Sequence, residues 1–353
     1  MFQRLQLSHF RSYAEAVVDF SPSVTIISGP NGSGKTNILE ALYVASRGTS
    51  FRASDSELLQ FDAPWWRLHA RTTDGERTIG FDNQRTLGKK QVIVEGVKKQ
   101  RLTPQHKLPL VLFEPNDLRL LDGSPARRRD FIDAFISQLN PTYAAQLHKY
   151  DRALRQRNNL LKTTQASDDE LFVWNMLLAE LGAAIITARQ QYIDHIQEQL
   201  TDVYRSIAKN DDIVTMAYSQ PRTDTLQQHL LDDLHQYQAR DRAYGFTSVG
   251  PHRHDILFAF NGSPATAVAS RGETRSIVLA LKLIEIAVIK RLLEKSPLLL
   301  LDDVFSELDT TRRSALVAVG RDIQTVITTT DADISQEFGA GVRHVTLPFN
   351  SQR

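Results

Sequence analysis

The stretch Gly29-Pro30-Asn31-Gly32-Ser33-Gly34-Lys35-Thr36 fits the pattern G-x-x-x-x-G-K-[ST] of a phosphate-binding loop. An apolar run typical of a buried strand precedes it at 24–28, and residues 37–46 follow with apolar positions at helical spacing. A strand that leads through a glycine-rich turn into a helix directs backbone N–H groups at an anion. The stretch therefore predicts an α/β fold built around a nucleotide-phosphate site.

Each residue type in the loop has a chemical role. Lys35 supplies positive charge to the β- and γ-phosphates, and the Thr36 hydroxyl is a ligand for Mg²⁺. The other positions let the backbone curl around the phosphates. We therefore predict that ATP or GTP, with Mg²⁺, is bound by Gly29, Pro30, Asn31, Gly32, Ser33, Gly34, Lys35 and Thr36.

A second acidic element follows the apolar run 298–301. Asp302 stands at the end of this predicted strand, where it would hold Mg²⁺, most often through water. Asp303 is placed to orient or deprotonate an attacking water, and we predict Lys35, Asp302 and Asp303 as catalytic residues. The alternative is a pair of acids that only ends a strand.

Composition indicates a globular chain and excludes several classes of site. The 353 residues carry 42 Lys and Arg against 41 Asp and Glu, so a polyanion site must be a local patch. The absence of Cys excludes disulfides, thiolate catalysis and cysteine-ligated metals. No apolar run reaches the length of a membrane span and the N-terminus does not read as a signal peptide, so we expect a cytoplasmic protein without a membrane partner.

The pattern along the chain changes twice. Residues 1–118 and 245–353 read as α/β, with a β subdomain at about 66–113, whereas 119–244 read as a helical lobe. Asn140-Pro141 opens one helix, and a 3-4-3-4 apolar spacing from Leu171 to Tyr192 predicts a longer one. Two helices packed in one lobe are expected, and an extended coiled coil is the alternative.

The wide spacing of the two nucleotide elements indicates a particular class of ATPase. Lys35 and Asp302 are 267 positions apart, too far for a small nucleotide kinase or GTPase. Residues 269–275 resemble the signature sequence of ABC-type ATPases, with Ser270 and Gly272 at its serine and second glycine. The resemblance implies that these two residues contact the nucleotide of the other subunit in a dimer. An ordinary helix N-cap at Ser270 is the alternative.

Four segments resemble the RecF family of DNA-repair ATPases, which have an SMC-like head. They are His9-Phe10-Arg11-Ser12-Tyr13 with the phosphate loop, Phe113-Glu114-Pro115-Asn116-Asp117-Leu118 with Arg127-Arg128-Arg129, Gly245-Phe246-Thr247 with Gly250-Pro251-His252-Arg253, and Leu301-Asp302-Asp303-Val304-Phe305-Ser306-Glu307-Leu308-Asp309. These segments extend from the N-terminus beyond residue 300. The helical middle is too short for the long coiled coil of SMC proteins.

The resemblance implies both a fold and a function. The fold is an ABC-type P-loop ATPase head with an inserted, mainly helical second lobe that lacks a long coiled coil. The implied function is an ATP-driven homodimer that clamps duplex, gapped or junction DNA and, with RecR and RecO, promotes RecA loading. Arg11 would approach the nucleotide, or else form an ion pair beside its strand. A transporter ATPase subunit and an SMC-like scaffolding head are the alternatives.

The chain departs from the family pattern at several positions. His254 stands where an acid is usual, and Arg271, Glu273 and Thr274 replace the usual glutamine-rich signature residues. The segment 327–331 lacks the switch histidine of transporters. Asp303 is one methylene shorter than the glutamate that transporters use, so we expect slow, DNA-stimulated hydrolysis with ATP acting as a switch.

Two segments concentrate the basic residues. Residues 85–107 hold seven cations, including Arg85, against one acid, and 119–162 hold nine against four acids. Such patches suit contacts with a phosphate backbone, although solvated faces are the ordinary explanation. The DNA contacts that we expect are Lys89, Lys90, Lys98, Lys99, Arg101, Arg127, Arg128, Arg152 and Arg155.

Overall fold

A computed structural model describes residues 1–84, 89–163, 167–331, 334–339 and 341–349 of the chain. The chain forms two compact units, of which the first comprises Met1–Asp117 and Glu285–Arg353 and the second Leu118–Ile284. The chain leaves the first unit after Asp117 and returns to it within helix α8 (Arg271–Leu293). The first unit is therefore interrupted in sequence by the second.

A five-stranded parallel sheet carries the ends of the predicted nucleotide strands. Its order is β14-β3-β13-β12-β8, and the strands are β3 (Val24–Ser28), β8 (Leu110–Phe113), β12 (Leu298–Asp302), β13 (Thr325–Thr329) and β14 (Arg343–Thr346). Strand β13 lies between β3 and β12, with Thr329 opposite Ser28 and Thr328 opposite Asp302. Because parallel strands end at the same edge, this register brings the phosphate loop and Asp302 to one edge.

A six-stranded antiparallel sheet forms the second layer of the first unit. Its order is β2-β1-β4-β5-β6-β7, with β1 (Phe2–Phe10), β2 (Tyr13–Asp19), β4 (Trp65–Thr72), β5 (Gly75–Asp82), β6 (Lys89–Val94) and β7 (Val97–Lys99). We expected a β subdomain within the ATPase lobe at about 66–113, and strands β4 to β7 form there. The sheet also includes β1 and β2, since Leu7 of β1 pairs with Leu68 of β4, whereas β8 belongs to the parallel sheet. The N-terminal strands and the later hairpins are therefore one sheet.

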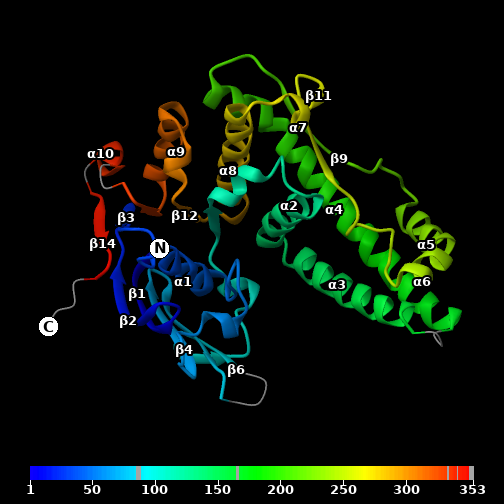
Figure 1. Cartoon of the computed structure of the whole chain (residues 1–353), viewed down its shortest axis with the longest axis horizontal. Helices are drawn as coiled ribbons and strands as arrows, with labels where there is room; N and C mark the ends of the chain where they lie inside the picture. Colours follow the sequence, from blue (N-terminus) through cyan, green and yellow to red (C-terminus); the bar gives the residue numbers. More distant parts are fainter. Residues whose placement is uncertain (85–88, 164–166, 332–333, 340, 350–353) are drawn as a thin grey trace. The chain divides into compact units, whose positions relative to one another are not determined.

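Helix α1 (Lys35–Arg47) packs in the core of the first unit (Figure 1). Its Ile38 and Leu42 are fully buried in a cluster that includes Leu7 of the antiparallel sheet and Val326 of the parallel sheet. The helical spacing of these apolar residues thus reflects a helix buried between two layers. Helices α9 (Thr310–Asp322) and α10 (Ser335–Phe338) complete the unit.

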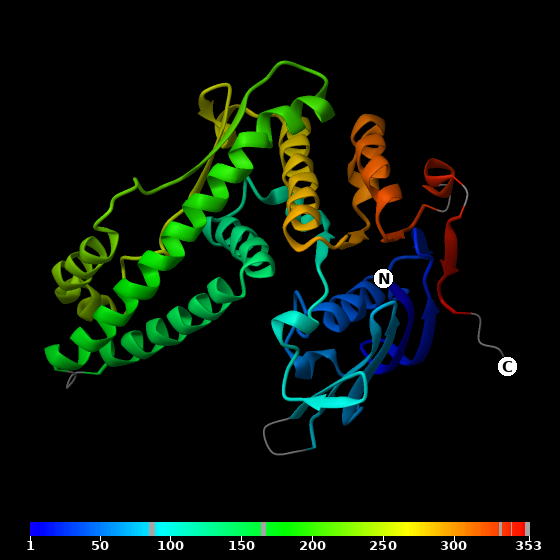
Figure 2. The same cartoon turned by 180° about the vertical axis from the view of Figure 1, so that it is seen from behind.

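The second unit is mainly helical. Its helices are α2 (Pro125–Leu139), α3 (Pro141–Leu161), α4 (Asp168–Ala208), α5 (Leu226–Gln236), α6 (Gln238–Tyr244), α7 (Ala265–Val268) and the first part of α8. The Asn140 side chain accepts hydrogen bonds from the N–H groups of Thr142 and Tyr143, so it caps α3 as its position before proline predicts. Helices α3 and α4 lie side by side (Figures 1 and 2).

Residues 245–284 correct one predicted boundary, because we expected them in the ATPase lobe and they pack in the helical unit. Strand β10 (Ile256–Phe260) pairs with β9 (Val214–Tyr218) and with the short β11 (Ser263–Pro264). In addition, Arg189 of α4 donates to the carbonyl oxygen of Pro251 at 2.7 Å. These contacts join segments far apart in sequence, which a scan along the chain does not reveal.

Helix α4 is the one helix in the described part of the chain that is long and apolar enough to cross a membrane. Its side chains Leu178, Ile185 and Ile193 are buried within the second unit, whereas Phe172, Val173 and Met176 are exposed. A core helix of a globular protein passes the same test, so this finding is weak evidence for a membrane span.

Candidate functional site

The predicted phosphate loop joins β3 to α1, and its shape depends on neighbouring residues. Gly34 precedes α1 with φ +96°, and a Cβ atom there would lie 2.6 Å from the Tyr13 hydroxyl. At Gly29 a Cβ atom would lie 2.7 Å from the carbonyl oxygen of Leu347. Both positions therefore require glycine, because the chain approaches the loop closely from two sides.

The Lys35 ammonium group is held within the loop. Its Nζ donates hydrogen bonds to the carbonyl oxygens of Gly29 at 2.8 Å and Pro30 at 2.9 Å, and the residue is buried. Phosphate oxygens would offer this cation charged acceptors, which bind more strongly than neutral carbonyls. The geometry therefore suits an anion at the loop.

The predicted metal ligands Thr36 and Asp302 are in contact. The Thr36 hydroxyl donates to Asp302 Oδ1 at 2.9 Å, and the Thr328 hydroxyl donates to the same atom at 2.6 Å. Thr328 is fully buried on β13 and was not among the predicted site residues. A signal for it exists, since a polar residue ends an apolar strand there, but its pairing with Asp302 depends on the sheet order.

Asp303 has an unusual backbone and an unpaired oxygen. It adopts φ +51°, and its N–H donates to Thr328 O at 3.1 Å. Burial raises the pKa of the Asp303 carboxyl, and the negative charge of Asp302 adds to this rise against the opposing effect of Lys35. Among the described residues, Asp303 Oδ1 and Ser33 Oγ are buried without a hydrogen-bond partner. Buried polar groups without a partner require an explanation, and a polar ligand bound at the loop would provide one.

The donor set of this site fits Mg²⁺ with a nucleotide. Thr36 and Asp302 provide the hydroxyl and carboxylate oxygens that Mg²⁺ prefers, and phosphates and water commonly supply its other ligands. Within the described ranges, no group of three or more His, Cys, Asp or Glu could hold a metal by itself. The site therefore suits a metal that arrives with phosphates.

Arg11 forms an ion pair beside its strand, which was the alternative to contact with the nucleotide. Its Nε and Nη2 donate to Glu40 at 2.8 and 2.9 Å, and its Nη1 donates to Glu57 O at 2.8 Å. Although burial would raise the pKa of Glu40, hydrogen bonds from Arg11, Arg52 and Ser50 lower it to about 2. This contact matches the alternative, an ion pair beside the strand. An approach of Arg11 to the nucleotide stays a prediction.

Ser270 and Gly272 lie at the start of α8, in the second unit. The Ser270 N–H donates to Glu273 Oε2 at 2.6 Å, and the Glu273 N–H donates to Ser270 Oγ at 3.3 Å. These two reciprocal hydrogen bonds form a capping box. Within one chain, Ser270 therefore acts as the N-cap of α8, which was the alternative role given above. Contact of Ser270 and Gly272 with a second subunit's nucleotide stays a prediction.

One of the predicted DNA contacts is corrected, because Arg128 is buried, with Nε and Nη2 paired to Asp255 at 2.8 Å. Lys90 is half-buried and pairs with Asp55, and its contact with DNA stays a prediction. Arg85 lies outside the described residues. Arg127 and Lys99 are half-buried. The exposed candidates are Lys89, Lys98, Arg101, Arg152 and Arg155.

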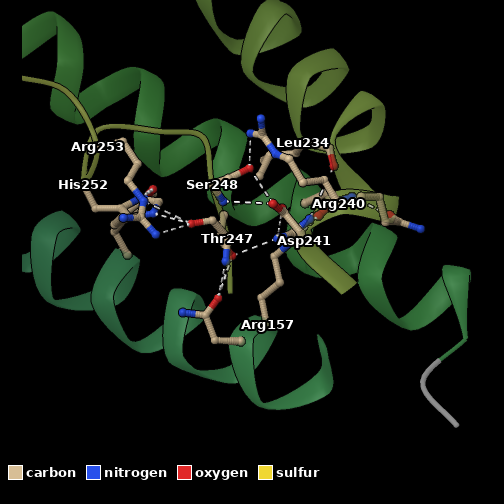
Figure 3. A network of polar contacts seen from close by, with 12 residues as sticks. Arg157, Leu234, Arg240, Asp241, Thr247, Ser248, His252 and Arg253 are labelled. Atoms are coloured by element: carbon tan, nitrogen blue, oxygen red, sulfur yellow. Dashed lines mark hydrogen bonds and ion pairs between the residues drawn. The ribbon is translucent and has the colours of Figure 1, made fainter. Parts of the chain in front are cut away.

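A buried polar network in the second unit was missed by sequence reasoning (Figure 3). Arg157 is fully buried and donates to Asp241 and Thr247 at 2.8 Å, and to Asn175 at 2.7 Å. The sequence counted Arg157 in a basic patch, since charge alone does not distinguish a buried arginine from a solvated one. This network connects α3, α4 and α6 to the segment 245–253.

Comparison with protein families and curated proteins identifies relatives over nearly the whole chain. Residues 1–346 match the model of the RecF/RecN/SMC N terminal domain. A DNA replication and repair protein RecF from Streptococcus thermophilus is 37% identical over 344 residues, which cover 94% of this chain and 92% of the relative. RecF of Halalkalibacterium halodurans is 35% identical and covers 98% of this chain and 95% of its own length.

Solved structures show the same relationship. The structure of the recombination mediator protein RecF-ATPrS in the RecFOR pathway matches with a TM-score of 0.85 and 30% identity, covering 94% of this chain and 93% of that one. An SMC head bound to the C-winged helix domain of ScpA matches with a TM-score of 0.54 at 15% identity, which shows the fold alone. The predicted ABC-type ATPase head with a helical insertion is confirmed, and the chain belongs to the RecF family.

Proposed function

We propose that this protein is an ATP-dependent DNA-binding switch of DNA replication and repair. The contact that supports the proposal best is the one between Thr36 and Asp302, which unites the phosphate loop with the acidic strand end across 266 positions. The names of the relatives support the repair role, and the RecF-ATP structure supports ATP as the nucleotide.

Each residue of the site would have a separate role in nucleotide binding or hydrolysis. Lys35 and the N–H groups of the loop bind the phosphates, while Thr36 and Asp302 hold Mg²⁺, which supplies charge neutralisation when bound. Asp303 orients or deprotonates the attacking water, and its raised pKa suits an acceptor in a partly buried site. Because the Asp303 side chain is one methylene shorter than the glutamate that transporters use, it positions water less well, and ATP turnover is slow.

The finer features of the proposal come from the family resemblance. ATP joins two chains, each presenting Ser270 and Gly272 to the nucleotide of the other, and the homodimer clamps duplex, gapped or junction DNA in the cytoplasm. RecR, and through it RecO and RecA, are the proposed partners. The exposed cations Lys89, Lys98, Arg101, Arg152 and Arg155 are candidates for contacts with the DNA backbone.

Light scattering with ATP and Mg²⁺ tests the composite site. We expect the wild type to dimerise with ATP, Asp303→Asn to accumulate as a stable dimer with turnover reduced about tenfold or more, and Lys35→Arg to stay monomeric. The exposed Lys290 provides a matched control, since Lys290→Arg should behave as the wild type.

An Asp303→Asn protein that stays monomeric with ATP would contradict the composite site. Two further measurements test the switch. They are the ATP turnover with and without DNA, and the DNA affinity with and without ATP. DNA binding that is the same without ATP would contradict the clamp and favour a scaffolding role.

A further inference from the structure

Thr328 lies on the strand between the two strands that carry the nucleotide site. Strand β13 pairs with β3, which leads into the phosphate loop, and with β12, which ends at Asp302. In this register Thr328 is the direct neighbour of Asp302, and its side chain is fully buried. A buried strand that is paired on both sides is among the most stable parts of a fold, so Thr328 has a fixed position beside the acidic strand end.

The single proton of the Thr328 hydroxyl is directed at Asp302. Thr328 Oγ1 lies 2.6 Å from Asp302 Oδ1 and 3.4 Å from the carbonyl oxygen of Leu301. The carboxylate is both the closer and the charged acceptor, so it receives the stronger hydrogen bond. The Asp303 N–H donates to the same hydroxyl oxygen at 3.1 Å. The hydroxyl therefore accepts from the backbone of Asp303 and donates to the side chain of Asp302.

The two hydroxyls that donate to Asp302 Oδ1 differ in their other tasks. Thr36, at 2.9 Å, is itself a predicted ligand of Mg²⁺ and belongs to the loop that would bind the phosphates. Thr328 belongs to a buried strand and is not a predicted ligand. Its β-branched side chain is restricted in χ1, so the hydroxyl has little freedom to turn away. Thr328 can therefore hold the carboxylate whether or not a nucleotide is bound.

We propose that Thr328 is a positioning residue whose hydroxyl fixes Asp302 in the orientation that holds Mg²⁺ with a bound nucleotide. Groups that hydrogen-bond to a metal ligand orient that ligand, and their removal commonly weakens metal binding about 10–100-fold. Thr328 acts through Asp302 and has no contact of its own with the metal or the phosphates in this assignment. The proposal rests on the proposed function and adds a residue to its metal site.

The substitution Thr328→Val removes the hydroxyl and keeps the branched shape of the side chain. Asp302 then keeps the Thr36 hydroxyl as a donor, and the Asp303 N–H keeps the backbone carbonyl oxygen at position 328, which lies 3.1 Å away. Neither group is left buried without a partner, so the variant should fold. Thr328→Ser restores a hydroxyl and should restore its effect.

The Mg²⁺ dependence of nucleotide binding tests this role. The probe is a fluorescent, non-hydrolysable ATP analogue, and anisotropy measures its affinity for the full chain in EDTA and at rising Mg²⁺ concentration. In Thr328→Val we expect the Mg²⁺ concentration for half of the gain in affinity to rise about tenfold or more. The affinity in EDTA should not change, because Lys35 and the loop still bind the phosphates. Thr328→Ser should resemble the wild type.

ATP turnover provides a second measurement of the same role. Thr328→Val should need more Mg²⁺ for half-maximal turnover, whereas its maximal rate at saturating Mg²⁺ should stay within about threefold of the wild type. The matched control is Thr325→Val. Thr325 is fully buried on the same strand, opposite Leu299, and its hydroxyl donates to the carbonyl oxygen of Gly320 at 2.9 Å. This control should keep the wild-type Mg²⁺ dependence, although its free energy of unfolding falls.

Three results would overturn the role of Thr328. They are a wild-type Mg²⁺ dependence in Thr328→Val, a loss of affinity in Thr328→Val that is equal in EDTA and in Mg²⁺, and an equal shift in Thr325→Val. In each case a Mg²⁺-dependent wild type leaves the proposed function intact. A wild type whose affinity for the analogue does not respond to Mg²⁺ would instead refute the proposed metal site, and the role of Thr328 with it.

Discussion

The phosphate loop of the first unit and the Arg157 network of the second unit are both polar sites, but they are built differently. In the loop, Lys35 contacts carbonyl oxygens five and six residues away. In the network, Arg157 contacts side chains 18, 84 and 90 positions away. A site made by a contiguous backbone segment is visible as a motif, whereas a site made by distant side chains is visible only after folding.

The largest expected effect in this comparison is the loss of the Arg157 charge. Arg157→Met leaves the fully buried Asp241 without its partner, and we expect the free energy of unfolding to fall by about 3–5 kcal/mol. Denaturant unfolding of the full chain checks this value. Arg155→Met is the matched control, because Arg155 is exposed on the same helix and its removal should cost less than about 0.5 kcal/mol. Equal effects of the two changes would show that burial does not distinguish these arginines.

The buried carboxylate of the first unit gives a smaller, pH-dependent effect. The pKa of Glu40 is about 2 in the folded chain against an ordinary value of 4.5. Its contribution, on the order of 2–3 kcal/mol, is therefore present above pH 4.5 and lost as the pH falls toward 2.

Unfolding free energies of the wild type and Glu40→Gln between pH 7 and 3 measure this contribution. We expect the difference between the two proteins to shrink as the pH falls, because the wild-type advantage disappears with the charge. A constant difference would mean that Glu40 acts through shape alone. Glu15→Gln is the control, since Glu15 is exposed on β2.

The smallest expected effect separates the two roles of Ser270. Ser270→Ala removes the N-cap of α8 and should lower the free energy of unfolding by about 1 kcal/mol, whereas Ser270→Asn retains a capping side chain and should be nearly neutral. If the hydroxyl also contacts a second chain's nucleotide, both variants should lose ATP-dependent dimerisation. Dimerisation by Ser270→Asn at wild-type level would leave Ser270 with the capping role alone.

The fold could be predicted where local pattern and tertiary position agree. The apolar run before the loop, the helical spacing of Ile38 and Leu42, and the cap at Asn140 all became the expected elements. The expected boundary at residue 245 was wrong, because strand pairing joins β10 to β9 of the helical unit. The expected β strands after residue 65 are present, but their pairing with β1 was not foreseen, since no local pattern specifies the partner of a strand.

The sequence by itself determined the phosphate loop, the acidic strand end and the family resemblance, because each is a contiguous segment whose chemistry depends on residue types at fixed spacing. The tertiary structure decided which charges are available. It paired Arg11 with Glu40, Arg128 with Asp255 and Arg157 with Asp241, leaving other cations in solvent. It also brought Thr328 to Asp302 through the order of parallel strands. The burial and the ion-pair partner of each basic residue depend on packing between distant segments. The basic residues that the sequence grouped together therefore include both buried ion pairs and exposed candidates for contact with DNA.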